Sequence, residues 1–189
     1  MPKSSKREII FTAAAKLFRD RGYQATSMRD LAEAVDLKAS SLYNHIGSKE
    51  EILKEICLAN ADKFSAGMQE VMHAEVSPLE KIKTLINMHI TIAVNDYTSV
   101  TSFNDEWRHL GEPALSNFKE KRKKYEREFL SIIEEGIAQK QIQDINPMVC
   151  MYTILSSTQW VYDAYLDLDQ SRISTDIKRM LISGIERNA

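Results

Sequence analysis

The chain has 189 residues and a mass of 21.6 kDa, with 43% hydrophobic and 28% charged residues and a formal net charge of −2. This balance is ordinary for a globular protein and excludes disordered, collagen-like and low-complexity classes. No apolar run approaches the roughly 18 residues of a membrane-spanning helix, and the run from Ile9 to Ala15 continues past Lys16 as a helical stripe rather than a signal peptide. We therefore expect a cytoplasmic protein with no membrane partner.

Charge distribution and cysteine content narrow the class further. Residues 1–49 carry a net charge of +4 and residues 50–189 one of −6, which suggests that only the N-terminal part meets a polyanion. Cys57 and Cys150 form neither a disulfide framework nor a zinc cluster, so we expect each to be a small buried apolar residue. The sequence implies no cofactor and no metal ion.

Residues typical of helix starts and ends divide the chain into about nine predicted helices. No segment alternates apolar and polar residues as a strand would. Ser27, Ser48 and Ser77 are N-cap candidates with an acidic residue three positions later, and a proline follows the caps Ser77 and Asn146. The predicted helices span about 5–21, 28–35, 39–45, 49–72, 78–95, 98–110, 113–140, 147–168 and 172–187. The expected fold class is all-α, with an N-terminal three-helix part and a larger C-terminal helical part.

The first three predicted helices have the spacing of a helix-turn-helix. An apolar stripe runs along the first helix, and two short helices follow, joined by a tight bend at Asp36 and Leu37. The small core that this arrangement requires would contain Leu31, Val35, Leu37, Leu42 and Ile46.

The second short helix presents small or hydrogen-bonding side chains outside its core positions, and no carboxylate. These residues are Ala39, Ser40, Ser41, Tyr43, Asn44 and His45. Small residues allow close approach to a major groove, while hydroxyl, amide and imidazole groups meet base edges or phosphates. Lys38 and Lys49 flank this helix, and Arg29 opens the preceding one, which suits phosphate contacts. The alternative interpretation is a polar surface turn between core helices.

Two segments, Thr26–Ala32 and Ser41–Leu53, resemble the DNA-binding domain of TetR-type transcriptional repressors, over about residues 6–54. The resemblance implies that Tyr43 and Lys49 contact phosphates, that Ser40, Ser41 and Asn44 lie near bases, and that Thr26 meets the DNA backbone. The complete expected DNA-binding set is Thr26, Ser27, Arg29, Lys38, Ala39, Ser40, Ser41, Tyr43, Asn44, His45 and Lys49.

We call the expected DNA-binding part, residues 1–47, the head. This chain departs from the family pattern at four positions of the head. Asp36 and Ser40 stand where glycine is common, Lys38 where Ser or Thr caps the recognition helix, and Ile46 where Phe is common. Asp can still occupy a left-handed turn. These four differences affect which operator sequence we expect the protein to bind. They do not affect the expectation that a DNA-binding domain is present.

The remaining part of the chain has no dinucleotide-binding, P-loop, nucleophile-elbow or zinc-protease motif. The resemblance to TetR-type proteins implies that residues 48–189 bind a small molecule and dimerise, whereas residues 1–47 bind DNA. In the helix 113–140, Arg122 falls within about 40° of Phe118 and about 60° of Tyr125 on the apolar stripe, where a cation is costly unless it is paired. It would meet an anionic ligand group, pair with a carboxylate such as Glu106, or extend to water.

Further side chains are candidates for the ligand pocket and the dimer interface. Phe103 and Trp107 form an aromatic line that belongs either to the core or to a ligand pocket. The helix 147–168 carries hydroxyl and amide groups that either form local hydrogen bonds or line a polar cavity. The expected ligand-binding set is Phe103, Trp107, Arg108, Arg122, Tyr125, Phe129, Ser156, Gln159 and Trp160. The expected dimer interface is Met148, Met151, Leu155, Ile173, Ile177, Met180, Leu181 and Ile185, since the last two helices would form a four-helix interface as in the family.

We call the remaining part, residues 48–189, the body. The body also resembles the TetR-type regulators of fatty-acid and other acyl-CoA catabolism. Three segments carry this likeness: Phe103–Leu110, Arg122–Phe129 and Glu135–Gly136. The resemblance implies an acyl-CoA effector, with its chain in an apolar tunnel and its phosphates near basic residues.

Rival interpretations remain open at this level. Glu70–His73 and Glu106–His109 are both Glu-x-x-His pairs, which build di-iron sites in helical bundles. A DNA-binding activator or architectural protein would have the same head as a repressor. His89 lies on an otherwise apolar helix and is interpreted as a core or interface histidine. The sequence favours a homodimeric repressor that a small molecule releases from a palindromic operator, without enzymatic activity.

Overall fold

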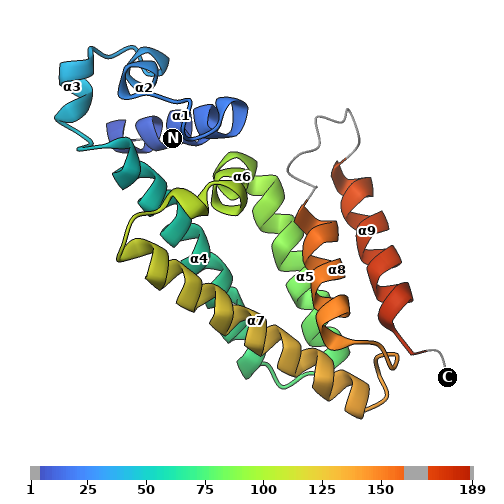
Figure 1. Cartoon of the computed structure of the whole chain (residues 1–189). Helices are drawn as coiled ribbons and strands as arrows, with labels where there is room; N and C mark the ends of the chain where they lie inside the picture. Colours follow the sequence, from blue (N-terminus) through green and yellow to red (C-terminus); the bar gives the residue numbers. More distant parts are fainter. Residues whose placement is uncertain (1–4, 160–169, 188–189) are drawn as a thin grey trace. The chain divides into compact units, whose positions relative to one another are not determined.

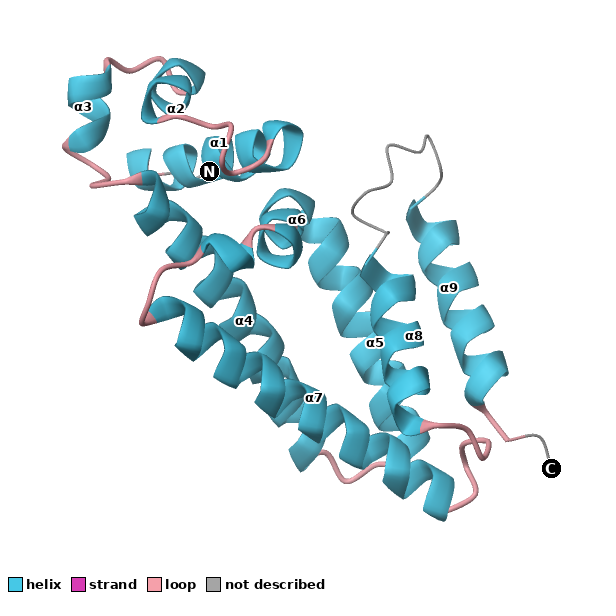
Figure 2. Ribbon diagram, viewed as in Figure 1, coloured by secondary structure: helices cyan, strands magenta, loops and turns pink. Residues whose placement is uncertain are grey.

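The computed structural model describes residues 5–159 and 170–187, and every regular element in these two ranges is a helix (Figures 1 and 2). A single bridge between Ile142 and Glu186 is the only strand-like pairing in the described part of the chain. The helices are α1 (Lys6–Arg21), α2 (Met28–Ala34), α3 (Ala39–Tyr43), α4 (Lys49–His73), α5 (Pro78–Asn95), α6 (Tyr97–Asp105), the 3₁₀ helix η1 (Trp107–His109), α7 (Ala114–Ala138), α8 (Pro147–Gln159) and α9 (Gln170–Ile185). The predicted all-α fold is confirmed.

Local capping chemistry sets most helix starts. The Ser27 side chain accepts a hydrogen bond from the Asp30 N–H while the Asp30 carboxylate accepts from the Ser27 N–H, a complete capping box. Ser48 caps α4 differently, because its hydroxyl accepts from the Glu51 N–H but the Glu51 carboxylate accepts from Gly47, one residue earlier. Asp36 adopts φ 53°, so it takes the left-handed conformation that the sequence predicts for the bend.

Two predicted helices end early. The helix expected at 98–110 is interrupted after Asp105, and residues 107–109 form the separate 3₁₀ helix η1. Asn104 and Asp105, weak helix formers, occupy the end of α6, and Gly111 and Pro113 prevent continuation further on. The recognition helix α3 ends at Tyr43 rather than at residue 45.

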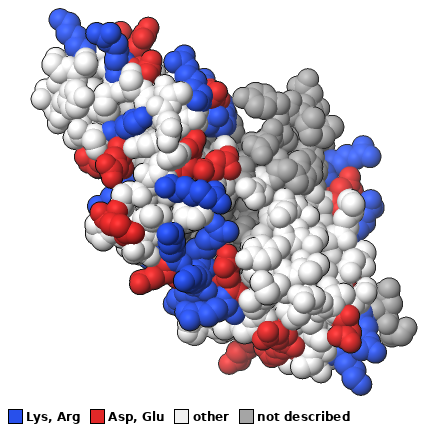
Figure 3. All heavy atoms as spheres, in the orientation of Figure 1, with Lys and Arg blue, Asp and Glu red and all other residues white. Residues whose placement is uncertain are grey.

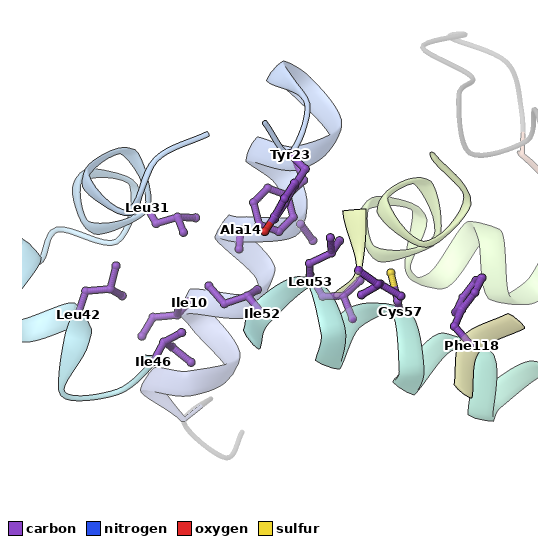
Figure 4. Close-up of a cluster of buried hydrophobic side chains, with 14 of the residues drawn as sticks. Ile10, Ala14, Tyr23, Leu31, Leu42, Ile46, Ile52, Leu53, Cys57 and Phe118 are labelled. Atoms are coloured by element: carbon purple, nitrogen blue, oxygen red, sulfur yellow. The ribbon is translucent and has the colours of Figure 1, made fainter. Parts of the chain in front are cut away.

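The chain folds as two compact units, one of residues 1–62 and 98–120 and the other of residues 63–97 and 121–189. Both α4 and α7 contribute residues to each unit. The predicted division at residues 47 and 48 concerns function and stays a prediction, but the packing of the first unit extends beyond it. Leu110 and Phe118 belong to the same apolar cluster as the head residues Leu31 and Leu42 (Figure 4).

In the second unit, α5 packs against both α8 and α9, and α8 also contacts α9. The connection between α7 and α8 passes close to Gly136, where a Cβ atom would collide with the Ile142 side chain. The Gln143 N–H donates to the Ile185 carbonyl at 2.9 Å, which ties this connection to the end of α9. Glycine at position 136 is therefore a packing requirement.

A membrane span requires a helix that is both long and strongly apolar. Within residues 5–159 and 170–187, no helix combines the length and apolar character that crossing a bilayer requires.

Candidate nucleic-acid interface and ligand-binding region

The recognition helix α3 is anchored from one side only. Leu42 and Ile46 are fully buried in the head core, to which α1 and α2 contribute Ile10 and Leu31 (Figure 4). The opposite side faces solvent, and the Tyr43 side chain is 54% exposed. The other exposed residues of the predicted set here are Ala39, Ser40, Asn44 and His45, while Ser41 is half-buried. The structure thus brings these predicted contacts onto a single exposed surface, which we call the recognition surface.

Cations and the α2 cap border the recognition surface. Lys38 and Arg29 are both exposed, and Lys38 makes no side-chain cap bond at the start of α3. The Ser27 hydroxyl is engaged with Asp30, and this hydrogen bond holds the pKa of the Asp30 carboxyl below its usual value. Ser27 therefore stabilises the start of α2, while Lys38 and Arg29 are free to approach an anionic surface.

Two predicted DNA contacts also have an internal role. The Thr26 side chain is 1% exposed, and its hydroxyl donates to the Gly22 carbonyl at 2.9 Å. The Lys49 ammonium donates to the carbonyls of Tyr23, Gln24 and Thr26, at 2.8, 3.3 and 2.8 Å. Because an ammonium has three N–H donors, these bonds use all of them. A phosphate contact would require Lys49 to give up a carbonyl, and the DNA contacts of both side chains stay predictions.

The same α1–α2 loop has a second partner, which no sequence pattern indicated. Glu106 accepts the Tyr23 N–H at 2.9 Å, and the His109 ring stacks on Tyr23 with centroids 5.5 Å apart. His109 Nε2 also lies 3.4 Å from the Glu106 carboxylate. This Glu-x-x-His pair therefore binds the head loop rather than a metal.

The predicted aromatic line of α6 and η1 packs into the first unit. Phe118 contacts Phe103 edge-to-face at 5.3 Å and Trp107 in a stacked arrangement at 5.4 Å. The Arg108 guanidinium lies 4.6 Å from the Trp107 ring centroid. Of the two interpretations that the sequence left open for this line, these contacts support the core.

Arg122 is not on a buried face, contrary to the expectation from its angular position. Its side chain is 48% exposed, and its Nε donates to Glu126 one turn later, at 3.0 Å. Angular position shows which residues share a helix face, but not whether a neighbour covers that face at each height. α7 passes from one unit to the other between Glu120 and Lys121, just before Arg122. Figure 3 shows Lys and Arg side chains gathered over α7.

Tyr125 and Phe129 lie in the second unit and are buried, as predicted for α7. Their rings contact edge-to-face at 6.1 Å, and the Tyr125 hydroxyl lies 2.6 Å from His89 Nε2. His89 stacks on Phe64 of α4 at 4.8 Å. The sequence indicated a core histidine at position 89 but not its partners, because they lie on two other helices, α4 and α7.

The polar residues of α8 differ in burial. Ser156 and Gln159 are exposed, whereas the neighbouring Thr158 is buried and its hydroxyl donates to the carbonyls of Ile154 and Leu155. The ligand role of Ser156 and Gln159 stays a prediction. Trp160, the last residue of the predicted ligand set, lies outside the described residues.

The predicted dimer interface separates into two groups. Met151, Ile177, Leu181 and Ile185 are at most 8% exposed, so they pack inside this chain and their assignment to an interface is corrected. Met148 and Met180 are 54% and 73% exposed, and Leu155 is half-buried. The side chain of Ile173 lies outside the described residues.

Other apolar residues lie on the same α8 face as Met148. Val149 and Tyr152, which were not predicted, are also exposed there, at 63% and 42%. α8 has no charged residue, and Figure 3 shows an uncharged area over it. A single chain thus leaves an apolar helix face uncovered.

A groove of about 280 Å³ lies between α5 and α9. No pattern in the sequence predicted this groove. It is lined by Lys83, Ile86, Asn87, Lys178, Arg179 and Ile182. Two of its cations are already compensated, Lys83 by Glu80 at 2.7 Å and Arg179 by Asp176 at 3.2 Å.

The described residues also bear on the di-iron alternative. Glu70 and His73 are exposed, and His73 Nδ1 lies 2.7 Å from the Gln69 carbonyl. Across the described ranges, no three His, Cys, Asp or Glu side chains are grouped as metal ligands would be.

Comparisons with known proteins agree with this geometry. A model of bacterial regulatory proteins of the tetR family matches residues 10–56, and a model of the tetracyclin repressor-like C-terminal domain matches residues 75–165. The HTH-type transcriptional repressor KstR2 of Mycolicibacterium smegmatis is 29% identical over 159 residues, which are 84% of this chain and 78% of that protein.

Solved structures share the fold. The ketosteroid transcriptional regulator KstR2 of Mycobacterium tuberculosis superimposes with a TM-score of 0.89 at 23% identity, covering 98% of this chain and 97% of its own. AibR, solved with isovaleryl coenzyme A and operator DNA, gives a TM-score of 0.80 at 24% identity and covers 94% and 98%. Both KstR2 proteins are named as regulators of transcription.

Proposed function

Since this chain belongs to the tetR family of bacterial regulatory proteins, it is a DNA-binding transcriptional regulator, and we propose that it is a homodimeric repressor which a small molecule releases from its operator. The observation that carries the proposal is the recognition surface, where α3 exposes small and hydrogen-bonding side chains with no carboxylate among them. Such a surface suits close approach to a major groove. The similarity to the repressor KstR2 supports repression rather than activation.

We assign different roles to residues of the recognition surface. Tyr43, exposed at the end of α3, contacts a phosphate, and Lys38 and Arg29 add charge beside it. Ser40, Ser41 and Asn44 lie near bases, and Ala39 and His45 complete the surface. Phosphate contacts are independent of sequence, whereas contacts to base edges discriminate between operators.

This division can be tested with a set of labelled DNA duplexes and fluorescence anisotropy at fixed moderate salt. Tyr43→Phe should weaken binding to every duplex by about the same factor, roughly tenfold for one lost bond to a charged group. Asn44→Ala should instead change the ranking of the duplexes. A Tyr43→Phe protein that kept its affinity but lost discrimination would contradict the assignment.

The operator itself should be sought first in DNA upstream of the protein's own gene. We expect binding there to be much tighter than to random DNA and to weaken steeply with salt. A genome-wide selection of bound fragments is the second measurement if the upstream region fails. Selected fragments without a common palindrome would refute the proposed operator symmetry.

The uncovered face of α8 and α9 is the proposed dimer interface. Met148, Val149, Tyr152 and Met180 would pack against their equivalents in a second copy, since a two-fold interface uses the same surface on both chains. At Gly184 of α9 an added side chain would meet open space, so a partner helix could approach closely there. A dimer would also give two recognition helices for two half-sites.

Sedimentation analysis of a double variant tests this interface. Val149→Lys with Met180→Lys should convert dimers to monomers, because it places charges where desolvation is required. Val76→Lys is the matched control, since Val76 is 50% exposed just before α5 and outside the proposed interface. A double variant that remained dimeric would move the interface elsewhere.

The proposed effector class is an acyl-CoA. Two things support it: the likeness of the body segments to acyl-CoA-responsive regulators, and the fold shared with AibR, which was solved with isovaleryl coenzyme A. The basic run on α7 between Lys119 and Lys124 would meet the phosphates. The ligand must bind more tightly to a conformation whose recognition helices no longer match the operator, and α4 is suited to transmit this change because it contributes to both units.

Anisotropy measurements on the operator complex, with acyl-CoAs of several chain lengths, test the effector class. Release by one range of chain lengths is the expected result. Ketosteroids should be included, because KstR2 of Mycobacterium tuberculosis is a ketosteroid regulator. Release by steroids alone would replace the acyl-CoA, and a complex indifferent to all of them would refute this effector class while leaving the DNA-binding function intact.

A further inference from the structure

A polar pair is surrounded by aromatic rings inside the second unit. His89 of α5 and Tyr125 of α7 are joined at 2.6 Å, through Nε2 and the phenolic oxygen. The imidazole stacks on Phe64 of α4, and Phe129 packs against the Tyr125 ring. Tyr125 and Phe129 are buried, whereas His89 retains partial exposure. The pair is therefore enclosed, but its imidazole still borders accessible space.

The pair retains one hydrogen to donate, whichever tautomer the imidazole takes. Burial lowers the pKa of His89 to about 4 and raises the pKa of Tyr125, so at neutral pH the imidazole has one N–H and the phenol keeps its O–H. One of these two hydrogens joins the residues. If Tyr125 donates, Nδ1–H of His89 remains, and if His89 donates, the phenolic hydrogen remains.

The remaining donor has no protein partner in the described part of the chain. The bond between His89 and Tyr125 is the only hydrogen bond that either side chain makes there. Because the imidazole is half-buried, this donor can still meet solvent, and a ligand acceptor would take the place of that water. The position therefore favours a ligand atom that accepts one hydrogen bond.

The local charge indicates which acceptor fits. Glu128 lies one turn after Tyr125 and accepts a hydrogen bond from Gln69 Nε2 at 2.9 Å. Its negative charge contributes to the raised pKa of Tyr125. Glu128 is also paired with Lys124 at 3.7 Å, so the main obstacle to a carboxylate or phosphate at the pair is poor solvation by the rings. An uncharged carbonyl oxygen does not meet this obstacle.

We propose that His89 and Tyr125 together form a specificity site in the effector pocket, which donates one hydrogen bond to an uncharged carbonyl oxygen carried on an apolar frame. The thioester of an acyl-CoA and the ring ketone of a steroid both have this chemistry. This inference rests on the proposed function, because it requires that the body binds an effector.

Two matched pairs of probes test the site by isothermal titration calorimetry on the full-length protein. One pair is octanoyl-CoA and S-octyl-CoA, a thioether that keeps the chain and the phosphates but lacks the carbonyl. The other is a steroid with a ring ketone and the same steroid without it. In the pair that fits the pocket, the carbonyl compound should bind about tenfold more tightly.

A double variant then assigns the preference to these residues. His89→Phe with Tyr125→Phe removes both polar partners together, a change that is close to neutral for stability when both are replaced by apolar groups of similar shape. The preference for the carbonyl compound should fall to about one, with the affinity for the compound lacking it unchanged. His73→Phe is the control, since His73 is exposed at the end of α4, and it should keep the preference.

The outcomes separate this inference from the proposed function. If the two members of a pair bound equally well and both released DNA, the carbonyl site would be overturned. The effector class to which that pair belongs would still stand. A preference that persisted in the double variant would have the same consequences. If no member of either pair bound, both the proposed effector class and the carbonyl site would fall together.

Discussion

The head and the body of this protein keep their polar groups in different places. In the head, Leu31, Leu42 and Ile46 fill the interior (Figure 4), whereas Ser40 and Asn44 of the recognition surface are exposed. In the body, the pair His89 and Tyr125 lies among aromatic rings. The head would therefore recognise its partner with an exposed surface, and the body with an interior one.

This difference has consequences for substitutions. Exposed residues such as Ser40 can change without altering the core, so DNA preference and stability should vary independently. Residues that line the interior of the body affect both, since packing and recognition use the same side chains. Four predictions test this contrast, from the largest expected effect to the smallest.

Leu42→Ala should destabilise the protein by about 3 kcal/mol, because it removes a fully buried side chain from the head core. Denaturant unfolding followed by circular dichroism measures the loss. Ser40→Ala, two residues earlier and exposed, should change stability by less than about 0.5 kcal/mol. Equal effects of the two substitutions would show that the head does not separate its core from its recognition surface.

His89 should make stability depend on pH in the acidic range. Its pKa is about 4 in the folded protein against 6.5 in the unfolded chain, so the unfolded chain takes up the proton first. The contribution is complete above pH 6.5 and is lost as the pH falls toward 4, by at most about 1.4 kcal/mol per pH unit. His89→Gln should reduce the slope of unfolding free energy against pH, whereas His73→Gln should not. An unchanged slope in His89→Gln would mean that the imidazole is solvated.

Lys49→Met should destabilise the protein by about 1–2 kcal/mol and weaken binding to all operators alike. The substitution keeps the aliphatic part but removes the donors to three carbonyls of the α1–α2 loop. Lys54→Met, on the exposed side of α4, is the control for loss of one positive charge. If the two variants lost DNA affinity equally and neither lost stability, Lys49 would act by charge and not by holding the loop.

Ser27→Ala should cost about 1 kcal/mol, since it removes the N-cap of α2 and one half of a capping box. Thermal unfolding detects a change of this size. Ser27→Thr should recover most of it, because its hydroxyl accepts from the backbone at an N-cap and can still donate to Asp30. Recovery of stability without recovery of operator binding would indicate that Ser27 also contacts DNA.

Much of the head could be predicted because its signals are local. The caps Ser5 and Ser27, the left-handed bend at Asp36 and the exposed side of α3 each depend on neighbours within a few positions. Periodicity also identified Leu42 and Ile46 as core. The internal roles of Thr26 and Lys49 were missed, because their partners are loop carbonyls that no side-chain pattern reveals.

The body was predicted less completely because its side chains are defined by distant partners. Arg122 has the angle of a buried residue but is exposed, and Met151 and Leu181 were assigned to an interface but are core. Each of these depends on whether another helix covers a given turn. Hydrophobic periodicity gives the direction of a side chain about the helix axis, and carries no information on what lies opposite it.

By itself the sequence determined the helices, their caps and the recognition surface of the head, since backbone propensity and local hydrogen bonds act within one or two turns. Only the tertiary structure decided that Lys49 binds loop carbonyls, that Glu106 holds the Tyr23 loop, and that His89 and Tyr125 share a hydrogen bond. These contacts join residues 23–83 positions apart. Their geometry is fixed when helices pack, and packing depends on the shapes of several segments at once.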